Sequence, residues 1–195
     1  YKPVAFEREA TGRFPESWPD PLSGVAIRGR MDRIDYQPEE RRYRVIDYKL
    51  KLGKSRAEPD KDLLRAALRG QRLQPPLYLL LGKEAVLPAG AETRGATVDA
   101  AFYFLAPRWP EGTLVVERLA AGAWENETGR SLVETVASIA AAIRSGLFFV
   151  QPGEHCRYCE VSEACRRNHR PTMWRIEKDA RSRSHAEIKQ KRVPS

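Results

Sequence analysis

Two stretches of the chain alternate apolar and polar residues with the period of two that is typical of a β-strand. Residues 25–35 form the first, with Gly29 as a point where the strand could bend or bulge, and residues 42–50 form the second. The link between them, from Gln37 to Glu40, is short and polar, as in a turn. The pattern therefore predicts a β-hairpin in the first third of the chain.

Further strands are expected on both sides of this hairpin. The alternation recurs over residues 3–9, 97–105 and 113–119. Residues 53–60 are charged and contain Gly and Pro, so they are expected to form a loop.

Helical periodicity lies between and after the strands. It covers residues 61–85, where Pro75 and Pro76 must start, kink or interrupt a helix. It also covers residues 127–145, which Gly146 follows as a stop signal. Helices and strands in this mixed order predict an α/β fold, with the hairpin in a central mixed sheet flanked by helices.

Length and composition restrict the class of protein. The 195 residues suffice for one sizeable domain, and 42% of them are apolar. Since no apolar run approaches the roughly 20 residues of a membrane-spanning helix, no membrane partner is expected. The first residues lack the layout of a signal peptide, and the absence of an initial Met suggests a piece of a longer protein. Three Cys fit a cytoplasmic protein better than a disulfide framework.

The net charge of +8 is concentrated in two blocks. Residues 41–72 carry eleven Lys and Arg against four Asp and Glu, and residues 166–195 carry ten against three. The rest of the chain is mildly acidic. Such clustering favours a polyanionic partner, although basic segments that serve only solubility are the alternative.

The hairpin also carries the most distinctive group of charged residues. Asp47 and Lys49 flank one residue, so their side chains project from the same face of the strand. Hairpin pairing is expected to bring Asp32 beside Asp47, whereas Asp35 should point to the other face unless a bulge intervenes. Two carboxylates with a lysine alongside suit a Mg²⁺-dependent phosphodiesterase. For Asp-x-Lys alone, a surface ion pair would be the better interpretation.

The strings G-R-M-D-R-I-D and V-I-D-Y-K-L together resemble the PD-(D/E)XK nucleases of the RecB and AddB type. The resemblance implies a restriction-endonuclease-like core in which Asp32 and Asp47 bind Mg²⁺ or Mn²⁺ and Lys49 takes part in catalysis. Gln74 and Tyr78 match the family's Q-x-x-x-Y helix motif and share a helix face, so both are expected beside the site. The implied activity is DNA hydrolysis, expected to be exonucleolytic, in recombination or repair. A helicase subunit or domain is the implied partner.

The cysteines add a second resemblance. Cys156-x2-Cys159-x5-Cys165 is similar to the last three ligands of the iron–sulfur nucleases of this family, which bind a [4Fe–4S] cluster. The fourth cysteine of that set is absent from this chain. Another interpretation is zinc, because His169 completes a Cys₃His set.

The chain is expected to divide at its last cysteine. Residues 1–166 would form the nuclease domain with its Cys segment, and residues 167–195 a basic extension that touches DNA, docks a partner or is disordered. Within the domain, four basic residues downstream of the site are expected to hold DNA phosphates: Lys51, Lys54, Arg56 and Arg72.

Two other classes of function compete with a nuclease. A DNA-binding or scaffolding module could keep the fold without cutting, but it would have no need of Asp47, Lys49 and the helix motif. A zinc-containing interaction domain would explain the cysteines but leave the Asp-Tyr-Lys strand unexplained.

Overall fold

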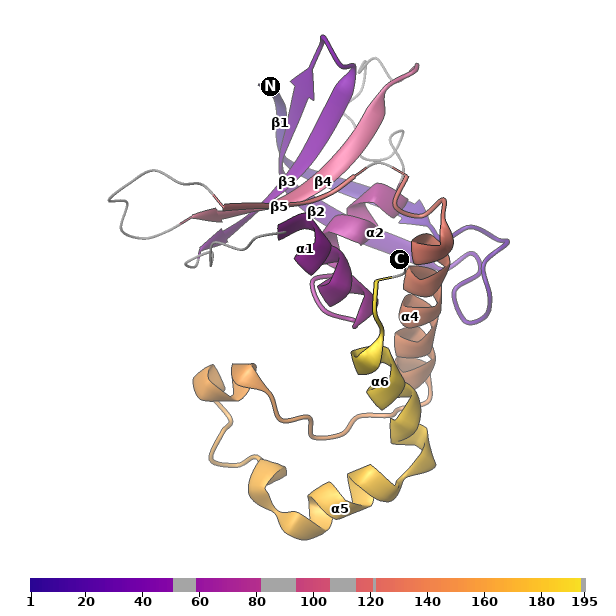
Figure 1. Cartoon of the computed structure of the whole chain (residues 1–195), viewed down its shortest axis with the longest axis vertical. Helices are drawn as coiled ribbons and strands as arrows, with labels where there is room; N and C mark the ends of the chain where they lie inside the picture. Colours follow the sequence, from indigo (N-terminus) through magenta and orange to yellow (C-terminus); the bar gives the residue numbers. More distant parts are fainter. Residues whose placement is uncertain (51–58, 82–93, 106–114, 121, 194–195) are drawn as a thin grey trace.

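The computed structural model describes residues 1–50, 59–81, 94–105, 115–120 and 122–193. A five-stranded sheet in the order β1-β2-β3-β4-β5 forms its centre (Figure 1). Strands β3 and β4 run parallel, and the other neighbouring pairs run antiparallel, so the sheet is mixed as predicted. The strands are β1 (Lys2–Arg13), β2 (Ala26–Gln37), β3 (Arg42–Leu50), β4 (Thr97–Leu105) and β5 (Val115–Leu119).

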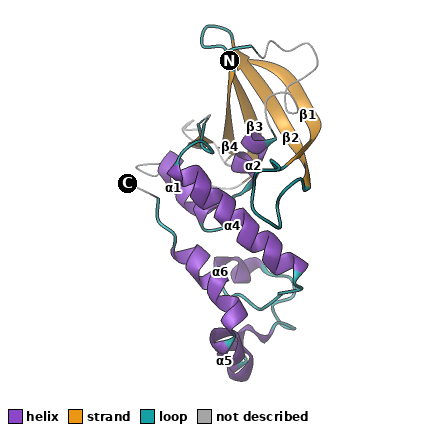
Figure 2. Cartoon of the chain, turned by 90° about the vertical axis from the view of Figure 1, so that its right-hand side faces the viewer, coloured by secondary structure: helices purple, strands orange, loops and turns teal. Residues whose placement is uncertain are grey.

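Helices pack against the sheet and then lead away from it. Figures 1 and 2 show α1 and α2 beside the sheet, α4 next to them, and the C-terminal helices further out. Among the described residues, no helix is long and apolar enough to span a membrane. The helical elements are α1 (Pro59–Leu68), α2 (Gln74–Leu80), α4 (Glu127–Arg144), η1 (Glu154–Tyr158), η2 (Arg166–Asn168), α5 (Arg170–Lys178) and α6 (Ala180–Gln190).

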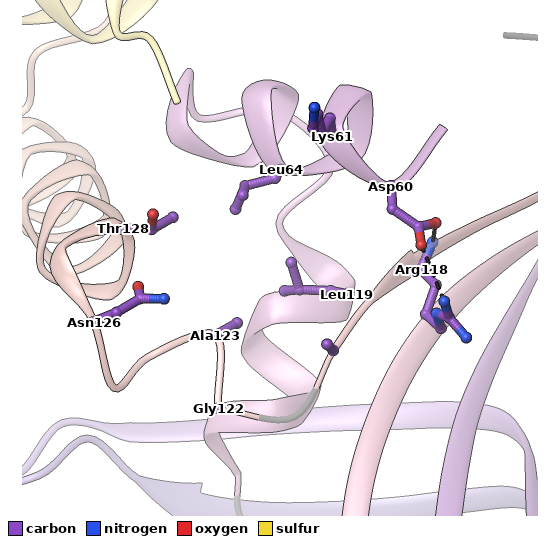
Figure 3. Close-up of a pocket in the computed structure, with 10 residues that line it drawn as sticks. Asp60, Lys61, Leu64, Arg118, Leu119, Gly122, Ala123, Asn126 and Thr128 are labelled. Carbon is purple, nitrogen blue, oxygen red and sulfur yellow. Dashed lines mark hydrogen bonds and ion pairs between the residues drawn. The ribbon is translucent and has the colours of Figure 1, made fainter. Parts of the chain in front are cut away.

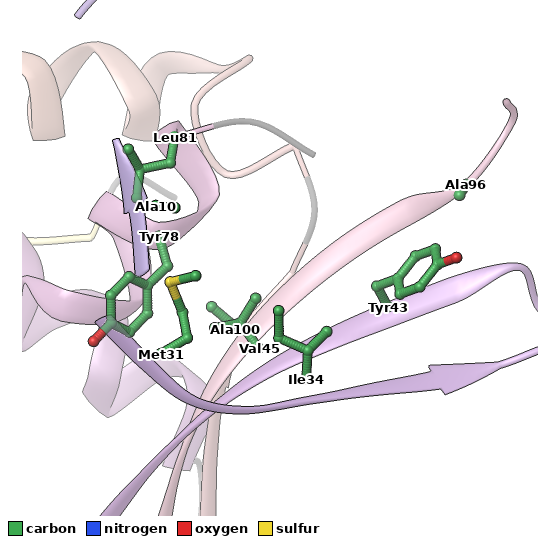
Figure 4. Close-up of a cluster of buried hydrophobic side chains, with 9 residues drawn as sticks. All are labelled: Ala10, Met31, Ile34, Tyr43, Val45, Tyr78, Leu81, Ala96 and Ala100. Carbon is green, nitrogen blue, oxygen red and sulfur yellow. The ribbon is translucent and has the colours of Figure 1, made fainter. Parts of the chain in front are cut away.

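The predicted hairpin is formed by β2 and β3. Ile34 lies opposite Val45, and both side chains are fully buried. Two residues closer to the turn, Tyr36 and Tyr43 lie opposite each other and stack with their ring centroids 4.3 Å apart. Figure 4 shows Ile34, Tyr43 and Val45 in one apolar cluster with Tyr78 of α2, and Tyr36 packs against this cluster. Burial of this face fixes the register, because a slip by one residue would expose the whole apolar set.

The helix expected over residues 61–85 is divided into α1 and α2. Gly70 ends the first helix in a left-handed conformation with a φ of +73°, and Arg72 in the link before α2 also has a positive φ, +51°. Pro75 and Pro76 lie in the first turn of α2, where a missing N–H costs nothing. The prolines therefore start a helix, one of the outcomes expected for them. Helix α4 ends as predicted, with Gly146 at a φ of +68° directly after its cap.

The bulge expected at Gly29 is absent, because β2 pairs with β1 without a register shift from Arg30 to Ala26. Glycine is favoured there for another reason. A Cβ at Gly29 would lie 3.1 Å from Cε1 of Tyr78 and 3.4 Å from Cδ1 of Leu81. The small residue therefore lets α2 approach the strand. Most of the loop expected over residues 53–60 lies outside the described residues.

The basic end of the chain folds back onto the helices. Ile188 of α6 is buried, and Lys191 donates a hydrogen bond from Nζ to the carbonyl of Ser131 in α4 at 2.9 Å. Arg69 in turn donates to the carbonyl of Lys191 at 3.1 Å. Helix α6 and the residue after it therefore pack against α4 and the end of α1.

Candidate functional site

The two predicted carboxylates meet across the hairpin. Pairing of Arg33 with Ile46 and of Ile34 with Val45 fixes the register, and one further residue along it places Asp32 opposite Asp47. Oδ2 of Asp32 accepts a hydrogen bond from the backbone N–H of Tyr48 at 2.8 Å. This hydrogen bond from Tyr48, the residue after Asp47, holds the side chain of Asp32 close to Asp47.

Four polar side chains of β3 and α2 form a closed ring of contacts. Lys49 pairs through Nζ with Oδ2 of Asp47 and donates a hydrogen bond to Oε1 of Gln74 at 2.8 Å. Nε2 of Gln74 donates to the hydroxyl of Tyr78 at 3.4 Å. That hydroxyl lies 3.3 Å from Oδ1 of Asp47, which closes the ring. The structure thus brings together Asp47, Lys49, Gln74 and Tyr78 as the sequence predicted.

Tyr78 donates the hydrogen bond that reaches Asp47. It is 5% exposed, and burial, followed by the negative charges of Asp47 and Asp32, raises the pKa of its phenol above the usual range. Its single proton is shared between the carbonyl of Arg30 at 2.9 Å and Oδ1 of Asp47 at 3.3 Å. The shorter hydrogen bond goes to the carbonyl of Arg30, so Oδ1 of Asp47 receives only the longer and weaker one.

Asp47 has the properties of a cation ligand. It is 4% exposed, and its Oδ2 is buried without a hydrogen bond from the described residues, although Lys49 lies beside it as an ion-pair partner. A buried carboxylate with this little hydrogen bonding is unusual, because such charges normally need several partners. Oxygen ligands of this kind suit Mg²⁺, so Asp47 and Asp32 fit a divalent cation.

Lys49 is fixed from three sides. Besides its contacts with Asp47 and Gln74, its Nζ lies 4.8 Å from the centroid of the Phe102 ring, within range of a cation–π contact. An ammonium group held in this way keeps its position beside the carboxylate. It can therefore donate to a negatively charged group in the site without first reorganising.

Asp35 lies outside the site, as expected from the alternation. Its carboxylate is buried and accepts hydrogen bonds from Arg33 at 2.5 and 2.8 Å. Arg33 also contacts the hydroxyl of Tyr48, whose side chain points away from Asp47 and Lys49. Asp35 and Arg33 therefore form a structural ion pair on the opposite face of the sheet.

A buried ion pair next to the site was not foreseen. Glu117 of β5 is 3% exposed, pairs in register with Phe102, and binds the guanidinium of Arg72. Arg72, which the sequence predicts to bind DNA phosphates, binds Glu117 in the structure and lies two residues before α2. The pair thus fastens the start of the helix that carries Gln74. The sequence held a signal for this pair. Glu117 and Leu119 are two residues apart in an expected strand, so Glu117 shares the buried face of Leu119.

The other predicted groups are less well defined by the structure. Lys51, Lys54 and Arg56 lie outside the described residues. Cys156, Cys159 and Cys165 are free thiols of intermediate exposure. Hydrogen bonds from the N–H of Gly153 and from Arg167 lower the pKa of the Cys156 thiol. Within the described part of the chain, no three His, Cys, Asp or Glu side chains are gathered to hold a metal ion, so the cysteines do not form a ligand set there.

A hollow in the surface lies apart from the predicted site residues. Figure 3 shows it between α1, the end of β5 and the start of α4, with a volume of about 300 Å³. Asp60 and Arg118 lie at its edge and bind each other, and Asn126 caps α4. None of the predicted site residues lines it.

Comparison with known proteins identifies the family. The model of the PD-(D/E)XK nuclease superfamily matches residues 1–166. A search among curated proteins found no match. Because the family match covers most of the chain, the protein belongs to the PD-(D/E)XK nuclease superfamily and is a nuclease. Its mixed sheet with flanking helices is the restriction-endonuclease-like core.

Proposed function

We propose that this protein hydrolyses phosphodiester bonds of DNA with a divalent cation, Mg²⁺ or Mn²⁺, held by Asp32 and Asp47. The observation that carries the proposal is the ring of contacts through Asp47, Lys49, Gln74 and Tyr78. A pure binding module would gain nothing from a buried carboxylate with an oxygen that accepts no hydrogen bond from its described neighbours.

Each side chain has a role that follows from its contacts. The cation, when bound, would lower the pKa of a water molecule and offset charge on the scissile phosphate. Lys49 orients the attacking water or stabilises the charge that develops on the phosphate. Gln74 holds the ammonium group of Lys49, and Tyr78 holds Asp47 in place by its hydroxyl.

The assignment to one branch of the superfamily rests on the sequence alone. The order of the strand motifs, the Q-x-x-x-Y motif and the cysteines supports the RecB and AddB branch, and with it exonucleolytic cutting during recombination or repair. In this proposal the domain comprises residues 1–166, acts in the cytoplasm, and is part of or partner to a helicase–nuclease. Residues 167–195 would then be an extension of the nuclease domain.

The [4Fe–4S] cluster is a separate part of the proposal, supported only by the spacing of Cys156, Cys159 and Cys165. Since the described residues do not gather these thiols into a ligand set, no step of the reaction is assigned to a cluster. Analysis of iron, sulfide and zinc in protein purified without oxygen tests whether a [4Fe–4S] cluster is bound. Stoichiometric zinc without cleavage would instead support an interaction domain.

The nuclease is tested with end-labelled single- and double-stranded DNA in Mg²⁺, Mn²⁺ or EDTA. The wild type is compared with Asp47→Ala and Lys49→Ala, and Asp35→Ala serves as a carboxylate control from the opposite face. Metal-dependent cutting should be lost in the first two variants. Cutting that survives Asp47→Ala would refute the assignment. DNA binding without any cutting would favour a module that has lost catalysis.

A further inference from the structure

The outward face of helix α5 carries a tryptophan between basic residues. Arg170, Trp174 and Lys178 follow one another at intervals of four, so they form one stripe along the helix. All three residues are exposed, and Trp174 is 60% exposed. Tryptophan is on average a well-buried residue, so an exposed one between two cations points to a ligand at this face.

The other face of α5 attaches the helix to its neighbours. Met173 and Ile176 are half-buried, and the helix contacts η2 and α6. At the junction with α6, the side chain of Asp179 accepts a hydrogen bond from the backbone N–H of Arg181 at 2.9 Å. These contacts fix α5 with Trp174 on its outward side, at the end of the molecule away from the sheet (Figure 1).

The basic residues around α5 divide into two groups. Arg167 and Arg181 serve the fold, because the first donates to a backbone carbonyl and the second binds a carboxylate. The side chains of Arg170, Arg175 and Lys178 form no ion pair or hydrogen bond within the described part of the chain. All three are exposed, so their charges are available to a ligand.

The charge of this region favours a polyanion. Residues 166–178 contain five Lys and Arg against one acidic residue, Glu177, which is exposed and lies three residues after Trp174. The outward face therefore keeps a net positive charge around its aromatic ring. A DNA strand offers both matching groups, because it carries regularly spaced phosphates and bases with flat faces.

We propose that α5 is a second DNA-binding surface, remote from the nuclease site. Arg170, Arg175 and Lys178 bind phosphates, and the indole of Trp174 stacks on an unpaired base. The inference rests on the proposed function, from which it takes DNA as the ligand, but it concerns a separate surface.

The position of α5 determines what this surface can contribute. Figures 1 and 2 show α4 between the sheet and α5, and its 18 residues span about 27 Å. At the duplex spacing of about 3.4 Å between phosphates of one strand, this length corresponds to roughly eight nucleotides. Helix α5 therefore anchors a long strand away from the cut, and it strengthens binding without touching the scissile phosphate.

The first test measures binding in EDTA, where no cutting occurs, by fluorescence anisotropy of a labelled thirty-residue oligothymidylate. Arg170→Gln/Lys178→Gln should bind about tenfold more weakly. The slope of log affinity against log salt should become less steep by about 1.4, since each phosphate contact on a single strand contributes about 0.7. The matched control, Arg42→Gln/Arg130→Gln, removes the same charge from the start of β3 and the first turns of α4. Equal loss in both double variants, or no loss in the first, would overturn the proposal.

The aromatic contact is tested separately from the charge. Trp174→Ala should bind the single strand about tenfold more weakly, whereas Trp174→Phe should retain most of the affinity. A blunt hairpin duplex should bind Trp174→Ala as tightly as the wild type, because its bases are already stacked. Phe6→Ala is the control, since Phe6 is an aromatic residue of β1 that is 64% exposed. Unchanged binding of the single strand by Trp174→Ala would overturn the stacking contact.

Cleavage and sedimentation separate the remaining outcomes. With Mg²⁺ and the thirty-residue strand, Trp174→Ala should raise KM and leave kcat unchanged, because α5 does not touch the reacting atoms. An equal fall in kcat would overturn the remote position of the contact. A dimer of the wild type that dissociates in Trp174→Ala would assign this face to a second copy of the chain instead. Failure of the proposed function appears differently, as no cutting of any substrate while both binding results persist in EDTA.

Discussion

The sheet with α2 and residues 147–179, here called the cysteine segment, differ in how their polar residues are held. In the sheet, the hairpin ladder and the burial of Ile34 and Val45 fix where Asp32 and Asp47 lie. In the cysteine segment, no residue of η2 or α5 is buried. It contains Tyr158, Val161 and Trp174, three of the most exposed large apolar side chains of the described structure.

The difference shows which kinds of sequence pattern define geometry. An alternating strand pattern specifies which residues share a face, and pairing with the next strand completes the site. Cysteine spacing specifies the identity of ligands, but the thiols come together only through a folding contact or a bound metal. The nuclease site is therefore the part of this molecule that substitutions in the described residues can test most directly.

The largest effect should come from the buried ion pair of Glu117 and Arg72. Arg72→Ala leaves the carboxylate of Glu117 buried without its cation, which should lower the free energy of unfolding by about 3 kcal/mol. Urea denaturation measures this loss in the free energy of unfolding. The contrasting variant is Arg181→Ala, which breaks the exposed pair with Asp179 at the junction of α5 and α6 and should leave the urea midpoint close to that of the wild type.

A double variant separates charge from packing at this pair. Arg72→Met/Glu117→Met removes both charges and should recover most of the lost stability. Equal unfolding midpoints for Arg72→Ala and the wild type would show that the pair does not fasten α2.

A matched pair of valines compares the apolar packing of the two regions. Val45 is fully buried beneath the site, whereas Val161 is 65% exposed. Val45→Ala should reduce the free energy of unfolding by about 2 kcal/mol through lost burial and a residual cavity. Val161→Ala should change it by less than about 0.5 kcal/mol. Similar losses in thermal and urea unfolding would mean that the cysteine segment packs as tightly as the sheet.

The hairpin and its site could be predicted because their determinants are local. Asp32, Asp47 and Lys49 lie on two strands joined by a short turn, so alternation and pairing suffice to place them together. The position of Gln74 and Tyr78 on one face of α2 could also be predicted, because these residues are one helical turn apart. Glu117 could not be placed in the same way, since its contact with Arg72 depends on the pairing of β5 with β4, two strands that are far from Arg72 in the sequence.

A smaller effect is expected from the hydroxyl of Tyr78. Tyr78→Phe removes the donor shared by Asp47 and the carbonyl of Arg30, which should cost about 1 kcal/mol of stability. Cleavage should fall by about tenfold, as for the loss of a group that supports a metal ligand. Tyr158→Phe is the control, because Tyr158 is 88% exposed in the cysteine segment. Equal activity of the two variants would contradict the role given to Tyr78.

The smallest effect concerns the attachment of the cysteine segment to α6. His185 hydrogen-bonds through Nε2 to Oε1 of Gln151 at 2.6 Å, and its ring packs edge-on against Phe149. Burial, and then the charge of Lys189, lower the pKa of His185 below its ordinary value of 6.5. The unfolded chain therefore binds the proton more readily than the folded one, so stability is complete above pH 6.5 and declines as the pH falls through that value. Limited proteolysis at pH 8 and pH 5.5 should show faster cleavage within residues 147–179 at the lower pH. His185→Gln should reduce this difference, and an unchanged difference in that variant would assign it to another group.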